Sequence, residues 1–418
     1  MIVYRAQLAR AEALLGELLS SSGPADAVVS RYFRAHRNLG QQDRAFVAET
    51  VYAVLRRRRS LEAAAGSGAP RDLAIAALVR VRGLSGRALE GVVREGEENL
   101  VARVRAAKTD TFPPAVRADM PDWLWDRLAA LYGPEEAMRV AQGLLNPAPL
   151  DLRVNLAKLD RDEALARLQA SGVEAQATPY SPAGIRVTGK PAINRHPLFT
   201  GGAVEVQDEG SQLLAYLLAP RRGEMVADYC AGAGGKTLAL AMLMRGTGRL
   251  YAMDVSARRL AELAPRAARA GVTSVHPLVL SGESDARAKR LAGKIDRVLV
   301  DAPCSGFGTL RRNPDLKWRH GPEAVAELAA KQARILEAAA RLLKPGGRLV
   351  YATCSILPEE NEAVADAFAA THADFKPLSC RELLAAQRID LACAERLRLW
   401  PHVHACDGFF AAAFEKRA

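Results

Sequence analysis

The chain has 418 residues, of which 49% are hydrophobic and 25% charged, and it carries a formal net charge of +11. A chain of this length exceeds one ordinary domain, so we expect two or three. No apolar run approaches the ~18 residues that a membrane-spanning helix needs, and the N-terminus lacks the apolar core of a signal peptide. We therefore expect a cytoplasmic protein that does not enter a membrane.

The six cysteines lie far apart, and no two of them form a C-x-x-C pair. This spacing is typical neither of a disulfide framework nor of a zinc site. We therefore expect free thiols in a reducing compartment and no bound metal.

Residues 1–118 are predicted to be helical and basic. Apolar residues recur at helical spacing at Leu8, Ala11, Leu14, Leu15 and Leu18, and the pattern continues to about residue 107. The excess of Lys and Arg is concentrated here, which favours a polyanionic partner because these side chains displace counterions from phosphates. The arginine run 56–59 fits either a solvated helix end or a phosphate contact, and both interpretations stay open. We predict an all-helical RNA-binding domain over residues 1–118.

The pattern changes over residues 119–200. Helices are predicted after Pro121 and Gly133, and a further helix is predicted at 162–170. Short strands are predicted at residues 151–155, 173–178 and 184–188. We expect a small α+β subdomain that also binds RNA.

Residues 201–418 alternate between strand, loop and helix. Strands are predicted at residues 225–227, 249–253, 274–280, 296–300, 348–352 and 408–414. Such alternation predicts a doubly wound, mostly parallel α/β sheet, and the last strand, which no helix follows, is expected to join it antiparallel. In sheets of this kind ligands bind at the carboxyl ends of the strands.

A glycine-rich loop follows the first of these strands and reads Cys230-Ala231-Gly232-Ala233-Gly234-Gly235-Lys236. An ATP-binding P-loop would need glycine at position 230, and a dinucleotide fingerprint would need glycine at position 237, so both ligands are disfavoured. Asp254, at the end of the next strand, is placed to accept hydrogen bonds from ribose hydroxyls. The pattern fits S-adenosylmethionine as cofactor, and a structural tight turn capped by Asp254 is the alternative.

Two later strands each end in a cysteine, in Asp301-Ala-Pro-Cys304 and in Thr353-Cys354-Ser355. A thiolate that adds to carbon 6 of a pyrimidine activates carbon 5 toward a sulfonium methyl donor, and a base must then remove the carbon-5 proton before the thiolate leaves. An acid near the ring nitrogen helps by neutralising the charge that develops on addition. Asp301, Cys304 and Cys354 supply such a set. These residues alone do not tell which cysteine attacks, and either thiol also fits a small buried hydrophobe.

Several motifs, in order, resemble those of the RsmB/NSUN family of RNA 5-methylcytosine methyltransferases. They are D-Y-C-A-G-A-G-G-K-T at 228–237, D-A-P-C-S-G at 301–306, N-P-D-L-K-W at 313–318 and Y-A-T-C-S-I-L-P-E-E-N-E at 351–362. V-Q-D-E-G-S-Q at 206–212 and D-G-F-F at 407–410 resemble the family's flanking motifs. The likeness covers roughly residues 120–418, and residues 1–118 more loosely resemble the NusB-like domain of RsmB-type 16S rRNA enzymes.

The resemblance implies a Rossmann-like class I methyltransferase sheet with Cys354 as nucleophile, Cys304 assisting product release and Asp301 at the edge of the cytosine. It also implies that residues 230–236 and Asp301 lie beside S-adenosylmethionine and that Asp254 binds its ribose. Glu283 is chosen to border the adenine, with Asp285 as the other candidate. The family's Ala-Pro is Gly232-Ala233 here, a departure expected to loosen the loop.

The expected function is therefore S-adenosylmethionine-dependent methylation of a cytosine in 16S rRNA by a monomer. A tRNA substrate is the alternative within the class, and a non-catalytic RNA-binding assembly factor is the alternative outside it. Around the centre, Arg311, Arg312, Lys317 and Arg319 are candidates to contact phosphates, and Trp318 is expected to pack in a core.

Overall fold

A computed structural model describes residues 3–189 and 191–417. By its packing the chain divides into two units, Met1–Pro147 with Thr309–Pro322, and Ala148–Gly308 with Glu323–Ala418. In the described part of the chain, no helix is long and apolar enough to span a membrane.

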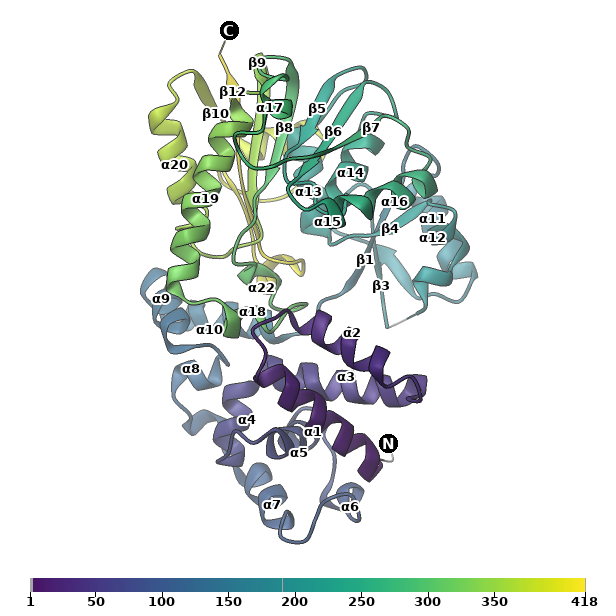
Figure 1. The fold of residues 1–418 in the computed structure, drawn as a ribbon, viewed down its shortest axis with the longest axis vertical. Coiled ribbons are helices and arrows are strands. Elements are labelled where there is room, and N and C mark those ends of the chain that lie inside the picture. The colour runs from purple at the N-terminus through teal and green to yellow at the C-terminus, as the bar shows by residue number, and fades with distance from the viewer. Residues whose placement is uncertain (1–2, 190, 418) are drawn as a thin grey trace. The chain divides into compact units, whose positions relative to one another are not determined.

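The first unit is helical and is built around α5 (Pro70–Arg80), as Figure 1 shows. Arg71 and residues 73–79 of this helix are buried, and Pro70 occupies its first turn, where the missing N–H would have no helical partner. The helices packed on it are α1 (Arg5–Leu19), α3 (Gln41–Arg56), α4 (Arg58–Ala65) and α7 (Glu98–Ala106). The arginine run 56–59 therefore spans the junction of two helices rather than one helix end.

The remaining helices of this unit are mostly short. They are α2 (Ala25–Ala35), α6 (Gly86–Leu89), η1 (Thr109–Thr111), α8 (Pro114–Arg117), α9 (Asp122–Tyr132) and α10 (Pro134–Leu145). The helical prediction for residues 3–107 is thus confirmed, and the helices predicted after Pro121 and Gly133 are α9 and α10.

The chain re-enters this unit at residues 309–322, which include α18 (Leu316–Arg319). The Trp318 indole N–H donates to the Leu55 carbonyl at 2.7 Å, and Lys317 Nζ donates to the Arg56 carbonyl at 2.8 Å. Lys317 is buried, and this burial lowers its pKa to about 7. The expectation that Lys317 contacts phosphates is therefore wrong, because its ammonium group faces backbone inside the unit.

The second unit contains two sheets. The smaller is antiparallel with strand order β2-β3-β1-β4, from Ala175–Ala177, Gly184–Val187, Leu150–Val154 and Val204–Val206. Helices α11 (Arg161–Ala170) and α12 (Pro197–Thr200) and the 3-10 turn η2 (Ile193–Arg195) accompany it. This arrangement confirms the α+β pattern predicted between residues 151 and 188.

The larger sheet has the strand order β10-β12-β9-β8-β5-β6-β7, with β11 paired to β12. Strands β9, β8, β5, β6 and β7 are parallel, while β12 pairs antiparallel with β9. Their bounds are β5 Met225–Asp228, β6 Arg249–Asp254, β7 Val275–Val279, β8 Ile295–Asp301, β9 Leu343–Thr353, β10 Phe375–Leu378, β11 Leu397–Leu399 and β12 Phe409–Lys416. All six predicted strands are confirmed, and the last of them pairs antiparallel as predicted.

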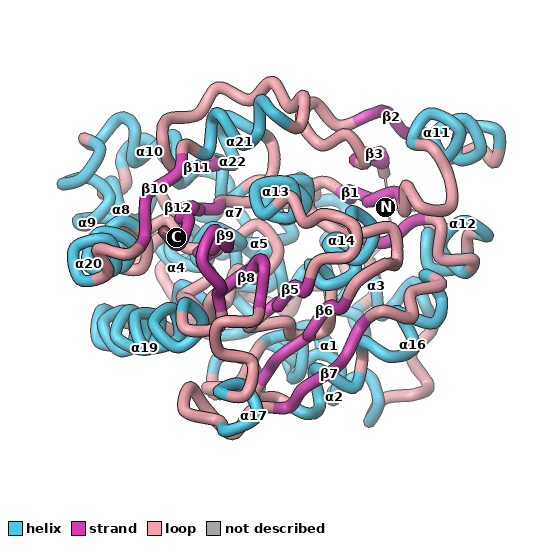
Figure 2. The backbone as a smooth tube through the Cα atoms, turned by 90° about the horizontal axis from the view of Figure 1, so that it is seen from above, coloured by secondary structure: helices cyan, strands magenta, loops and turns pink. Residues whose placement is uncertain are grey.

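Helices cover both faces of this sheet (Figure 2). One face packs on α13 (Glu209–Leu218), α14 (Gly235–Leu243) and α21 (Cys380–Ala386), and the other packs on α19 (Pro322–Ala340) and α20 (Glu362–Thr371). Within β8, Leu299 faces the first set while Val298 and Val300 face the second, as the two-residue period of a strand requires. Shorter helices connect the strands: α15 (Ala257–Ala261), α16 (Leu263–Ala270), α17 (Ala286–Lys289) and α22 (Pro401–His404).

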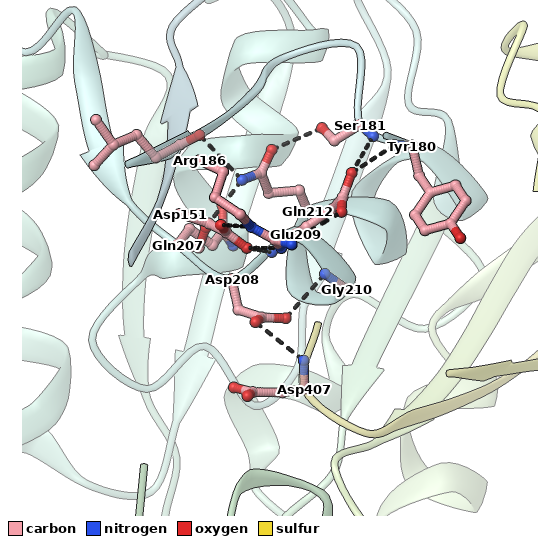
Figure 3. Close-up of polar contacts among 11 residues, drawn as sticks. Asp151, Tyr180, Ser181, Arg186, Gln207, Asp208, Glu209, Gly210, Gln212 and Asp407 are labelled. Carbon is pink, nitrogen blue, oxygen red and sulfur yellow. Dashed lines mark hydrogen bonds and ion pairs between the residues drawn. The ribbon is translucent and has the colours of Figure 1, made fainter. Parts of the chain in front are cut away.

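A buried polar network joins the smaller sheet to the start of α13 (Figure 3). Arg186 binds both carboxylate oxygens of Asp151, at 2.7 and 2.9 Å. Glu209 accepts hydrogen bonds from the backbone N–H groups of Tyr180 and Ser181. The V-Q-D-E-G-S-Q motif therefore connects the smaller sheet to α13, which packs on the larger sheet.

Candidate active site

The predicted site residues meet at the carboxyl edge of the larger sheet. A cavity of about 660 Å³ is lined there by the ends of β5, β6 and β8, by the loop after β7, by Cys354 after β9 and by part of α19. Of the predicted residues, those that line it are Cys230, Asp254, Glu283, Asp301, Cys304 and Cys354. The edge lies beside the point where strand order reverses, because β5 pairs with β6 on one side and β8 on the other.

Asp254 anchors the glycine-rich loop. Its Oδ2 accepts a hydrogen bond from the backbone N–H of Gly232 at 2.7 Å, and its Oδ1 accepts one from Ser256 at 2.7 Å. Each carboxylate oxygen has a second lone pair, so Asp254 can also accept hydrogen bonds from ribose hydroxyls in the cavity that it lines. Asp254 thus holds the turn and also lines the cavity.

The Gly232-Ala233 departure does not leave the loop unanchored. Gly232 has φ +55°, a conformation that glycine adopts without steric cost, and Arg266 donates to the Ala233 carbonyl at 2.6 Å. A Cβ on Gly232 would come within 2.5 Å of the Arg259 guanidinium. Glycine therefore makes room for Arg259, which lines the cavity.

Lys236 extends from the start of α14 to the acidic residue of β8. Its Nζ lies 2.6 Å from Asp301 Oδ2 and 5.6 Å from the centre of the Phe409 ring. Burial lowers the pKa of Lys236, but Asp301, Cys354 and Asp228 together raise it by more, so the net pKa lies above its usual value. Lys236 is therefore a cation held between the glycine-rich loop and Asp301. Of the loop residues predicted to lie beside the cofactor, Cys230 lines the cavity, whereas Ala231, Gly232, Ala233, Gly234, Gly235 and Lys236 do not.

The thiols of Cys304 and Cys354 face each other with their Sγ atoms 3.4 Å apart. The hydrogen bond to Cys354 and then burial raise the pKa of Cys304 well above its usual value. Either sulfur can donate the hydrogen bond to the other. The structure thus brings together the two cysteines that follow β8 and β9.

Glu283 and Asp285, the two candidates for the adenine contact, have different surroundings in the loop after β7. Glu283 lines the cavity, whereas Asp285 is buried and accepts hydrogen bonds from the backbone N–H groups of Ser281 and Arg287. Hydrogen bonds from Arg287 and these backbone groups hold the pKa of Asp285 below its usual value. Asp285 therefore caps α17, and Glu283 is the one placed to meet a ligand.

Arg259, Lys331 and Ile335 are among the cavity residues that sequence reasoning missed. Lys331 and Ile335 are four residues apart on α19 and so share one face of that helix. Their spacing was visible in the sequence, but helical periodicity cannot tell which face of a helix meets a cavity built by distant loops.

The cavity fits S-adenosylmethionine. The Asp254 carboxylate, at the end of β6, and the two thiols line the same cavity. Leu280 and Ile335 give this cavity an apolar side. Apolar walls with a few placed polar groups are typical of cofactor sites.

Comparisons with known proteins agree with this geometry. Residues 215–415 match the family described as 16S rRNA methyltransferase RsmB/F, and residues 120–194 match its ferredoxin-like domain. The chain is 32% identical to the probable ribosomal RNA small subunit methyltransferase B of Synechocystis sp., across 94% of this chain and 95% of the relative. It is 34% identical to the corresponding Bacillus subtilis protein, across 81% and 76%.

Among solved structures, a methyltransferase homolog from Pyrococcus horikoshii is 32% identical, with a TM-score of 0.63 over 72% of this chain and 97% of that one. The predicted family and class of fold are thereby confirmed, and S-adenosylmethionine is the cofactor of such a methyltransferase. The chain belongs to the RsmB/F family of 16S rRNA methyltransferases.

Proposed function

We propose that this protein transfers a methyl group from S-adenosylmethionine to carbon 5 of a cytosine in 16S rRNA, through a covalent adduct with Cys354. The observation that carries the proposal is the 3.4 Å contact between Cys304 and Cys354 beside Asp301, in the cavity that Asp254 also lines. A thiolate, a neutral thiol and a carboxylate are the groups that the reaction needs. A structural cysteine pair would not require the carboxylate or the cavity.

In the proposed reaction the Cys354 thiolate forms a bond to carbon 6 of the ring, and the electron pair gained at carbon 5 attacks the methyl carbon. S-adenosylmethionine supplies that methyl group from a sulfonium centre. A base then takes the carbon-5 proton, and the electrons left behind expel the Cys354 thiolate. Cys304 lies against Cys354 and assists this last step.

Asp301 is proposed to select cytosine. Its Oδ2 lies 2.6 Å from Lys236 Nζ, and the oxygens of a carboxylate accept hydrogen bonds. An acceptor suits the exocyclic amino group of cytosine and repels the carbonyl oxygen that uracil carries at the same position. Because the reacting carbon lies within a base stack in a duplex, an unpaired or flipped-out cytosine is expected.

We further propose that residues 1–118 and 119–200 hold the RNA while residues 201–418 carry out the chemistry, in a monomer. The basic excess of residues 1–118 and the match of residues 120–194 to a family domain support this division. Base-independent phosphate contacts would make binding weaken steeply with salt.

The test is methyl transfer from labelled S-adenosylmethionine to 16S rRNA and to tRNA by wild type, Cys354→Ala and Cys304→Ala. We expect activity on 16S rRNA, loss of at least about a thousandfold in Cys354→Ala because no adduct can form, and trapped RNA on denaturing gels with Cys304→Ala. Cys393→Ala, which alters a cysteine outside the cavity, is the control.

Methylation of tRNA alone would replace the substrate. RNA binding without methyl transfer to either RNA would replace the enzyme by an assembly factor.

A further inference from the structure

Glu360 lies in the motif that follows Cys354, but the proposed chemistry gives it no role. Its side chain is fully buried. Its carboxylate does not line the cavity and so cannot touch a substrate there. A buried carboxylate is costly unless it is well hydrogen-bonded, so its partners indicate what it does.

The partners of Glu360 come from both cysteine loops. Its Oε1 accepts a hydrogen bond from the backbone N–H of Ser305 at 2.7 Å, and its Oε2 accepts one from the Ser305 hydroxyl at 2.5 Å. The same Oε2 accepts a hydrogen bond from the Ser355 hydroxyl at 2.5 Å. Ser305 follows Cys304 and Ser355 follows Cys354, so one carboxylate holds the neighbour of each thiol.

A third element completes the cluster. Gln332 of α19 donates from Nε2 to Glu360 Oε1 and to the Pro303 carbonyl, both at 3.0 Å. In the described part of the chain no lysine or arginine forms an ion pair with Glu360. The carboxylate is thus hydrogen-bonded by neutral donors with fixed directions. Such bonds orient the loops that carry the donors.

The next residue provides an internal comparison. Asn361 is also fully buried, but it binds only the Cys354 side, through Thr353 Oγ1 at 2.5 Å and the Ser355 carbonyl at 3.1 Å. Asn361 therefore fixes one loop to its own helix start. Glu360 alone of the two bridges both loops.

We propose that Glu360 is a positioning residue that fixes the separation of the Cys304 and Cys354 thiols by bonding the loop of each. This inference rests on the proposed function for its consequence in catalysis, but its geometric content stands apart from it. If the loops separate, Cys354 can still attack the base while Cys304 is too far away to assist release. Loss of Glu360 should then slow release more than adduct formation.

The test measures the coupling of the two thiols without RNA or cofactor. In buffers of oxidised and reduced glutathione, two protein thiols exchange with one oxidised glutathione to give a protein disulfide and two reduced glutathiones. Sulfur atoms 3.4 Å apart need to approach to about 2.05 Å, so we expect wild type to form the disulfide readily. Mass spectrometry of the peptides that contain Cys304 and Cys354 measures the equilibrium.

We expect the effective concentration of the thiol pair to fall about tenfold or more in Glu360→Ala. Glu360→Gln keeps nearly the same volume, but its amide nitrogen is a donor that would face the donors now bound to the carboxylate. We therefore expect a fall smaller than that in Glu360→Ala. Glu362→Gln is the matched control, because Glu362 lies in the same motif but pairs with Arg398. Circular dichroism verifies that each variant is folded, and Glu360→Gln replaces Glu360→Ala if the latter does not fold.

A second readout follows methyl transfer. Glu360→Gln should lower kcat, leave the KM for S-adenosylmethionine unchanged and accumulate trapped RNA as Cys304→Ala does. A folded Glu360→Ala variant with the wild-type thiol equilibrium would overturn the proposal even if methyl transfer is confirmed. If wild type methylates no RNA but Glu360→Ala still weakens the coupling of the two thiols, the positioning role stands. The proposed function is then overturned instead.

Discussion

Asp228 shows how one buried carboxyl couples stability to pH. It ends β5, is fully buried and accepts a hydrogen bond from the Thr237 hydroxyl at 2.7 Å. Burial raises its pKa to about 7, whereas an aspartate in an unfolded chain titrates near pH 4. Between these values the folded protein holds a proton that the unfolded chain has released. The free energy of unfolding therefore falls as the pH rises from about 4 to 7.

Asp228→Asn removes this titration. As the pH rises from 5 to 8, the unfolding free energy of wild type should fall by about 2 kcal/mol relative to that of the variant. The reason is that only wild type ionises a carboxyl group inside the core. Thermal melting of both proteins at the two pH values measures this difference. Asp110→Asn changes an exposed carboxyl and should follow wild type. Parallel pH profiles for wild type and Asp228→Asn would refute the argument.

Sequence reasoning reached the residues that sit where strands end. Asp254, Asp301, Cys304 and Cys354 all follow buried strands, and the carboxyl ends of parallel strands share one edge. It did not reach Lys331, because a residue on a long helix acquires its neighbours only through tertiary packing. The same limit applies to Glu360, whose hydrogen bonds to both cysteine loops arise only through tertiary packing.

The two glycines Gly308 and Gly408 hold β12 against the cysteine loops. The backbone N–H of Gly308 donates to the Cys354 carbonyl, and the backbone N–H of Gly408 donates to the Gly308 carbonyl, both at 2.8 Å. A Cβ on Gly308 would lie 2.2 Å from the Gly408 carbonyl oxygen. The D-G-F-F motif is therefore a backbone contact that supports the loop of Cys354.

Gly308→Ala should force these backbones apart. We expect a loss of about 2–3 kcal/mol in unfolding free energy, since backbone atoms cannot yield as a flexible side chain can. Chemical denaturation measures this loss. Gly16→Ala is the control, because Gly16 lies within α1 and its Cβ would meet nothing within 4 Å. That control should be neutral or stabilising by up to about 1 kcal/mol, and equal effects of the two substitutions would contradict the packing argument.

Two of the strands that sequence patterns failed to predict lie at one edge of the larger sheet. Strands β10 and β11 are short, and both pair only with β12. Such edge strands carry little apolar periodicity, and their pairing is decided by the neighbour rather than by their own sequence. Residues 344–347, Lys-Pro-Gly-Gly, lie within β9, opposite a register shift between Ile295 and Arg297, although proline and glycine favour turns. Irregular pairing at that point accommodates the glycines and the proline.

The path of the chain gives the helical unit a structural part in addition to the RNA binding proposed for residues 1–118. Residues 309–322, which begin five residues after Cys304, pack with residues 1–147. Asp315 accepts a hydrogen bond from the backbone N–H of Ala25 at 3.1 Å, and Trp318 and Lys317 donate to α3 carbonyls. No local sequence pattern could have predicted this, because the partners are separated by more than 250 residues.

A chain truncated to residues 119–418 should therefore lose more than affinity for RNA. Without Ala25, Leu55 and Arg56, the segment 309–322 loses the hydrogen bonds of Asp315, Trp318 and Lys317, so trypsin should cut after Arg311 and Lys317 about tenfold faster or more than in the full chain. Exposed Arg388 provides an internal standard whose cleavage rate should not change. Adding residues 1–118 as a separate polypeptide should restore protection if these contacts re-form. A truncated protein that resists cleavage between residues 309 and 322 would show that the segment is held without the helical domain.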